Sequence, residues 1–102
     1  MELVYLNLNR TKVDLIDALN PVAMTVLSIE DTGVESIVKL EGCKLKRFFC
    51  KGAPIRNFRP IYGAPIRYMS ISSPEEKQQL FGELSKLTIV NGQNIHDNPL
   101  WN

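Results

Sequence analysis

Short apolar runs, rather than long amphipathic segments, mark the first half of the chain. Residues 3–8 form a run of strand length. Residues 22–29 are rich in β-branched side chains and apolar at most positions, which is typical of a strand inside a sheet. From residue 34 to 41 apolar and polar positions alternate, as along a strand with one buried face. The pattern therefore predicts three strands ahead of Gly42.

A turn at Glu41-Gly42 separates the alternating segment from residues 43–50. Glycine readily adopts the positive φ of a tight hairpin, so we expect residues 22–50 to form a three-stranded antiparallel meander. Both faces of its last strand mix charge with aromatic surface. These faces are Lys44, Lys46, Phe48 and Cys50 on one side, and Cys43, Leu45, Arg47 and Phe49 on the other.

Two short helices are predicted. Thr11 begins a capping box ahead of residues 12–19, whose apolar positions share one helical face. Ser73-Pro74 is a clearer helix start, with Ser73 as N-cap and Pro74 at the first helical position, and predicts a helix over residues 74–86. Its buried stripe would be Leu80, Phe81, Leu84 and Leu87.

The order of elements predicts a single α+β domain over residues 1–102, with the topology β-α-β-β-β-loop-α-β. A mainly antiparallel sheet with the two short helices packed on it accommodates that order. The last strand is expected at residues 88–90, and residues 91–102 read as a polar C-terminal tail. A chain of 102 residues, 44% of them hydrophobic, can build one modest core and is too short for two.

Residues 51–69 are predicted to form a Pro/Gly-rich basic loop, because three prolines and two glycines interrupt any regular element. The prolines also restrict motion in the unbound state. Within this loop the pentapeptide Gly-Ala-Pro-Ile-Arg occurs twice, at residues 52–56 and 63–67. Each copy would turn the chain, bury its isoleucine and present its arginine.

The near-neutral total charge of +1 hides a strongly basic middle. Residues 1–38 carry two basic and six acidic groups, residues 39–67 carry eight and one, and residues 68–102 carry two and four. Such a separation can steer an anionic partner to one part of the surface even when the total is near zero. Residues 39–68 also hold five of the eight aromatic residues.

Basic and aromatic residues in one stretch suit single-stranded RNA or DNA, whose phosphates bind Lys and Arg and whose bases stack on aromatic rings, each stacked base contributing about 1–3 kcal/mol. We therefore expect a small non-enzymatic nucleic-acid-binding protein acting through residues 39–68. Phe49 and Tyr68 are interpreted as core residues. The predicted binding residues are Lys44, Lys46, Arg47, Phe48, Lys51, Arg56, Phe58, Arg59, Tyr62 and Arg67.

Two other partners fit the same stretch. Arginine and aromatic residues are enriched where proteins bind one another, so an adaptor or inhibitor that recognises an acidic protein surface is the first alternative. The two arginines of the repeated pentapeptide could also bind a small anionic nucleotide. Lys44 and Lys46 could, on a third interpretation, simply protect an edge strand from pairing with another sheet.

Little in the sequence indicates catalysis. His96 stands alone in the polar tail, and no nucleophile elbow, phosphate-binding glycine loop or metal-spaced cluster is present, so no catalytic residue, metal or cofactor is predicted. A metal-free ribonuclease is neither supported nor forbidden. Cys43 and Cys50 are expected to be reduced and partly buried. Without a long apolar run or a leader-like N-terminus, we expect a cytoplasmic protein that does not enter membranes; its oligomeric state does not follow from the sequence.

Overall fold

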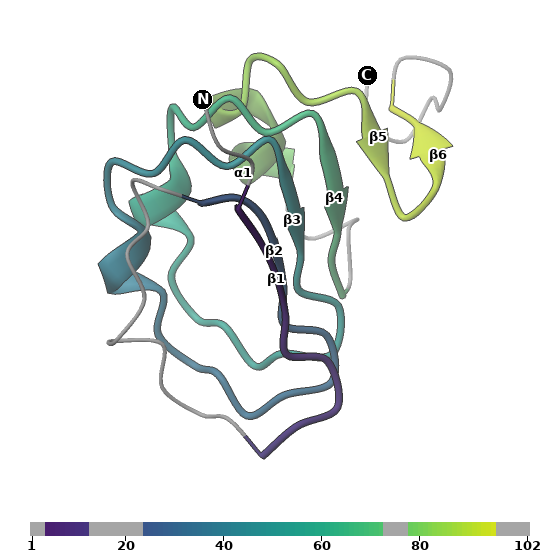
Figure 1. Cartoon of the computed structure of the whole chain (residues 1–102). Coiled ribbons are helices and arrows are strands. Elements are labelled where there is room, and N and C mark those ends of the chain that lie inside the picture. Colours follow the sequence, from purple (N-terminus) through teal and green to yellow (C-terminus); the bar gives the residue numbers. More distant parts are fainter. Residues whose placement is uncertain (1–3, 13–23, 73–77, 96–102) are drawn as a thin grey trace.

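In the computed structural model, which describes residues 4–12, 24–72 and 78–95, the strands form one six-stranded sheet (Figure 1). The strands follow each other in sequence order, and β1 to β5 are all parallel. Only the last pair, β5 and β6, is antiparallel. The strands are β1 (Val4–Asn7), β2 (Met24–Ser28), β3 (Arg47–Phe49), β4 (Tyr68–Ser70), β5 (Ile89–Val90) and β6 (Gln93–Asn94).

A 21-residue repeat generates the parallel sheet. The strand register aligns five apolar side chains at this constant interval along the chain, and from Leu27 onward all are buried. They are Leu6, Leu27, Phe48, Met69 and Val90. Each turn of the chain thus places one strand beside the previous one, so that neighbouring turns bury a common core. The molecule is a short solenoid.

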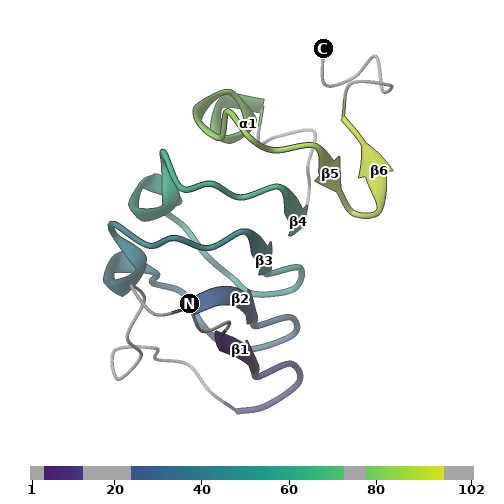
Figure 2. The ribbon, with the colours of Figure 1, turned by 45° about the horizontal axis from the view of Figure 1, so that its top comes forward.

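The opposite side of each turn is built from apolar residues three positions apart. In the second turn these are Val34, Ile37, Leu40 and Cys43, all buried, and the 3₁₀ helix η2 (Val38–Leu40) lies among them. The next turn repeats the pattern at the same interval with Ile55, Phe58, Ile61 and Ala64, around η3 (Arg59–Ile61). A three-residue spacing suits a 3₁₀ turn, in which residues i and i+3 are aligned. In Figure 2 the strands line one side of the stacked turns and these helices line the other.

The corners of the turns also repeat at this interval. After β1, β2 and β3 the chain bends at Arg10, Asp31 and Gly52, which all have positive φ (59°, 57° and 85°). A second corner, which leads into the following strand, uses Gly42 and Gly63 (78° and 82°). Glycine adopts this conformation without the steric cost that a Cβ brings. The corner residues therefore set the length of each turn.

These corners explain the repeated pentapeptide. Its first copy forms the corner after β3, and its second copy forms the corner that leads into β4, so the two copies lie on opposite sides of one turn. Ile66 is fully buried, whereas Ile55 is only partly buried against the core. The spacing of the two copies is thus about half of the structural repeat.

The mixed strand and helix content is confirmed, but the mainly antiparallel sheet is wrong. The segment 24–28 is a strand buried along its whole length and flanked on both sides, as expected for residues 22–29. Residues 34–41 form no strand. Their apparent alternation gives way to the three-residue spacing, which buries Ile37 and leaves Val38 56% exposed. No hairpin forms at Gly42, although its φ is positive as predicted.

The predicted C-terminal helix is present in its described part and ends before residue 86. Within the described residues α1 spans Gln78–Glu83, and the apolar stripe from Leu80 to Leu87 is buried. The expected last strand is β5, followed by the turn at Asn91 and Gly92 and by β6. The predicted helix over 12–19 and the N-cap at Ser73 lie outside the described residues.

Candidate binding face

One face of the parallel sheet is lined by two rows of side chains that point away from the core. We call these rows the sheet face. The first row is Tyr5, Val26, Arg47, Tyr68 and Ile89, and the second is Asn7, Ser28, Phe49 and Ser70. Both rows recur at the same interval as the core row and flank it, since side chains alternate between the two faces of a strand. The sheet face therefore combines aromatic, aliphatic, cationic and hydroxyl groups from five successive strands, although Val26, Ser28 and Ser70 are themselves buried.

Arg47 and Tyr68 form the centre of the first row. They are register partners on β3 and β4, and the guanidinium carbon of Arg47 lies 4.8 Å from the centroid of the Tyr68 ring. A stacked guanidinium is attracted by the electrons of the ring and keeps its N–H groups at its edge. No described carboxylate forms an ion pair with Arg47. The stacking thus holds a cation in place with its donors available.

A hydrogen-bond network ties the second row together around Glu30. The Asn9 side chain accepts from Ser28 Oγ and from Glu30 N, at 2.7 Å each, and donates to Glu30 Oε1 at 3.3 Å. Ser70 Oγ donates to the other carboxylate oxygen, Oε2, at 2.6 Å. Both oxygens of Glu30 are therefore engaged by neutral groups. The network fixes this carboxylate next to β4.

Two hollows on the sheet face meet at Arg47 and Phe49. The larger, of about 550 Å³, lies over β3 to β5, and Tyr68, Ile89 and Lys51 line it. The smaller, of about 460 Å³, lies over β1 to β3 and is lined by Tyr5, Thr25, Val26 and Lys46. Volumes of this size are within the usual range of about 300–1,000 Å³ for ligand sites. Thr25 Oγ1, beside the smaller hollow, is buried without a hydrogen-bond partner among the described residues.

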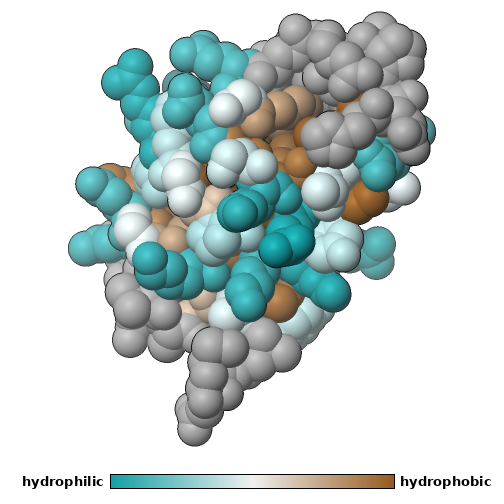
Figure 3. Space-filling view, turned by 90° about the horizontal axis from the view of Figure 1, so that it is seen from above, coloured by the Kyte–Doolittle hydropathy of each residue, from teal (hydrophilic) through white to brown (hydrophobic). Residues whose placement is uncertain are grey.

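Cations also gather where β3 and β4 begin. Arg67 N donates a hydrogen bond to Lys46 O at 2.8 Å, so these two exposed residues are neighbours, each directly before one of the adjacent strands β3 and β4. This side of the molecule is uppermost in Figure 1. Figure 3, which views that side directly, shows strongly hydrophilic side chains across its middle. With Arg47 and Lys51, the described part of the sheet face and its edges carries four cations, of which Arg47 and Lys51 line the same hollow as Glu30.

The ten predicted binding residues do not form one surface. Residues 44–67 make slightly more than one complete turn of the solenoid, so their side chains point to all sides. Lys46, Arg47 and Arg67 lie close together, and Lys51 follows on the same side. Arg56, Phe58, Arg59 and Tyr62 lie together on the far side of the turn, around a hollow of about 290 Å³. Lys44 is exposed at the corner before β3.

Three aromatic residues differ from their predicted positions. Phe48 is 0% exposed and offers no ring face to a base, whereas Phe49 is only half-buried. Lys46, just before β3, and Arg47, its first residue, are both exposed, and this shifts the alternation by one position. Tyr68, expected in the core, is 37% exposed. Tertiary packing of the repeat, rather than local alternation, decides these faces.

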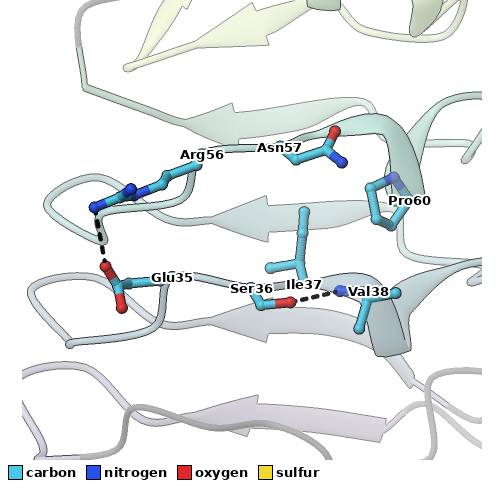
Figure 4. Close-up of a pocket in the computed structure, with 7 residues that line it drawn as sticks. All are labelled: Glu35, Ser36, Ile37, Val38, Arg56, Asn57 and Pro60. Carbon is cyan, nitrogen blue, oxygen red and sulfur yellow. Dashed lines mark hydrogen bonds and ion pairs between the residues drawn. The ribbon is translucent and has the colours of Figure 1, made fainter.

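A further hollow of about 460 Å³ lies on the far side, between the second and third turns (Figure 4). Arg56 Nη2 lies 3.5 Å from Glu35 Oε1 at its rim, and Val38 N donates to Ser36 Oγ at 3.4 Å. Both charged side chains are well exposed, so their ion pair contributes little to stability. Because Arg56 is paired with Glu35, it is less available to bind a phosphate than an unpaired arginine would be.

Tyr5, Val26, Ile89, Glu30 and Ser70 were not predicted as site residues. The signal that identifies them is the 21-residue interval, which aligns positions 5, 26, 47, 68 and 89. The 21-residue interval does not repeat a run of identical residues. The exact repeat in the sequence is the pentapeptide, whose copies are 11 residues apart.

Comparison with family models, with curated proteins and with solved structures finds no match for this chain. Within the described part of the chain no helix is both long and apolar enough to cross a membrane. The same residues contain no group of three or more potential His, Cys, Asp or Glu metal ligands. Function must therefore be argued from the sheet face itself.

Proposed function

We propose that this protein is a non-enzymatic interaction module that binds a protein partner on its sheet face. The observation that carries the proposal is the Arg47–Tyr68 stack, flanked by the hollows over Phe49 and Val26. Arginine and tyrosine dominate interface hot spots, particularly where apolar surface surrounds them. One strand per turn with a period of about 20–29 residues is also the geometry of leucine-rich-repeat solenoids, whose stacked strands provide extended binding surfaces.

A comparison of two matched variants tests the proposal. Arg47→Glu reverses a charge at the centre of the sheet face, and Arg59→Glu makes the same change on the far side of the same turn. A protein that binds the sheet face should be retained by the wild type and by Arg59→Glu in quantitative affinity capture, and lost by Arg47→Glu. Circular dichroism should give the same folded signal for all three chains. Equal capture by both variants would argue against the sheet face.

Single-stranded nucleic acid is the second candidate, favoured by the four cations Lys46, Arg47, Lys51 and Arg67 around exposed rings. In fluorescence anisotropy with labelled RNA and DNA oligonucleotides, the logarithm of the affinity would fall with the logarithm of salt concentration, by about 0.7 for each neutralised phosphate. Removing Arg47 or Arg67 would flatten this slope. Removing Arg56, which lies on the far side, would not. Tight, salt-dependent binding would favour this candidate over a protein.

A further inference from the structure

The arrangement of charged and apolar groups on the sheet face indicates what kind of segment it would bind. Resting on the proposed protein-binding function, we infer that the partner supplies an extended segment with an acidic residue midway between two apolar residues, in the order apolar-x-acidic-x-apolar. The carboxylate would meet Arg47 over Tyr68, and the two apolar side chains would enter the two hollows. Charge complementarity and the spacing of the strands lead to this pattern.

The charges of the sheet face favour an anionic group on the partner. Arg47 is held by its stack and has no ion pair with a described carboxylate. Glu30 is the acidic residue lining the larger hollow, and both its oxygens already accept hydrogen bonds. Lys46 and Lys51 line the two hollows beside Arg47. The face therefore has an excess of positive charge, with a planar donor group at its centre that suits a carboxylate.

The spacing of the strands favours a bound segment that runs across them. Neighbouring strands are about 4.8 Å apart, so Val26 and Ile89, three strands apart in the first row, are separated by about 14 Å. An extended chain places residues i and i+4 on the same side at about 13–14 Å. Residue i+2 then falls about 7 Å along, between Arg47 and Tyr68, where the guanidinium lies. A segment that crosses the strands thus matches all three positions.

The apolar positions have receiving surfaces at the required places. The smaller hollow has Val26 and Tyr5 in its lining, and Tyr5 is 58% exposed. The larger has Phe49 and Ile89, both half-buried. Lys46 lines the smaller hollow and Lys51 lines the larger. Each hollow therefore offers apolar surface beside a polar contact.

Selection of random peptides displayed on phage against the whole chain tests the inference. We expect enrichment of the apolar-x-acidic-x-apolar pattern. A fluorescein-labelled peptide from that set should bind the wild type and Arg59→Glu equally, and Arg47→Glu about 10- to 100-fold more weakly, the range expected for a hydrogen bond between charged groups. Replacing the acidic residue of the peptide by Lys should restore binding to Arg47→Glu. Simple loss of folding would not produce this recovery.

Different failures separate the inference from the proposed function. Enriched peptides that need Arg47 and Tyr68 but have no acidic centre would overturn the inference and leave a protein-binding face. Peptides whose binding ignores both residues, or no enrichment at all, would overturn both. Oligonucleotides that bind the chain and compete at Arg47 would replace the protein partner by nucleic acid.

Discussion

The two isoleucines of the repeated pentapeptide provide a matched test of the fold. Both lie in the sequence Gly-Ala-Pro-Ile-Arg, yet Ile66 is fully buried and Ile55 is only half-buried. Ile66→Ala removes three carbon atoms from a closed core and leaves a cavity, which should lower the free energy of unfolding by about 2–5 kcal/mol. Ile55→Ala removes the same atoms from a site that water can reach, so about 1 kcal/mol is expected from the lost burial.

Urea denaturation followed by circular dichroism measures both changes. If the slope with urea stays the same, the shift of the midpoint reports stability alone. For a chain of this size, about 1 kcal/mol shifts the melting temperature by about 4–8 °C, so Ile66→Ala should melt roughly 10–30 °C below the wild type. Arg56→Ala and Arg67→Ala are the controls, since exposed arginines contribute little to folding. Equal losses for the two isoleucines, or a larger loss for Ile55→Ala, would refute the assignment of the two copies to different corners.

Four further substitutions test particular positions. Gly63→Ala should cost about 1 kcal/mol because of its positive φ alone, and Gly52→Ala should cost more, because a Cβ there would lie 3.2 Å from Asp31 N and collide with Asp31 Oδ1; urea denaturation ranks the two. Gly82→Ala, in α1 with open space around it, should raise stability by about 0.8–1 kcal/mol in the same assay, and a loss would contradict the helix. Burial raises the pKa of the Cys43 thiol above its ordinary value of 9.0. The unfolded chain therefore releases this proton at lower pH than the folded chain, and the stability of the wild type relative to Cys43→Ala should shrink between pH 8 and pH 10; an unchanged difference would contradict a raised pKa.

Local patterns in the sequence predict several elements correctly. The apolar runs at β1 and β2 predict strands whichever neighbours those strands pair with. The apolar stripe from Leu80 to Leu87 likewise predicts a buried helix face in any topology. The same patterns do not reveal how strands pair. Parallel neighbours are joined here by the far side of a turn, whose 3₁₀ segments have only three residues each. Read locally, these connecting segments resemble a strand at residues 34–41 and a loop at residues 51–69.

The candidate site is predicted only in part, for a related reason. Composition identifies Arg47, which lies in the centre of the sheet face. Its neighbours across the sheet lie one whole turn away along the chain, beyond the reach of a contiguous stretch. Strict alternation, continued through the bend at Lys46, wrongly predicts that Phe48 rather than Phe49 is exposed. The 21-residue interval places Tyr68 beside Arg47. It also aligns Phe48 with the buried row and Phe49 with the outward row, as observed.

The constant 21-residue interval has a consequence for how such a molecule can change. Each turn presents the same register to the turns above and below it, so duplication of one interval adds a strand without altering the pairing of the others. An insertion of a single residue within a strand would instead reverse the faces of the residues that follow. Lengthening by whole turns would extend the sheet face by about 4.8 Å at each step. The sheet face can therefore grow in discrete units, and the outward residues of each new strand can vary independently of the core.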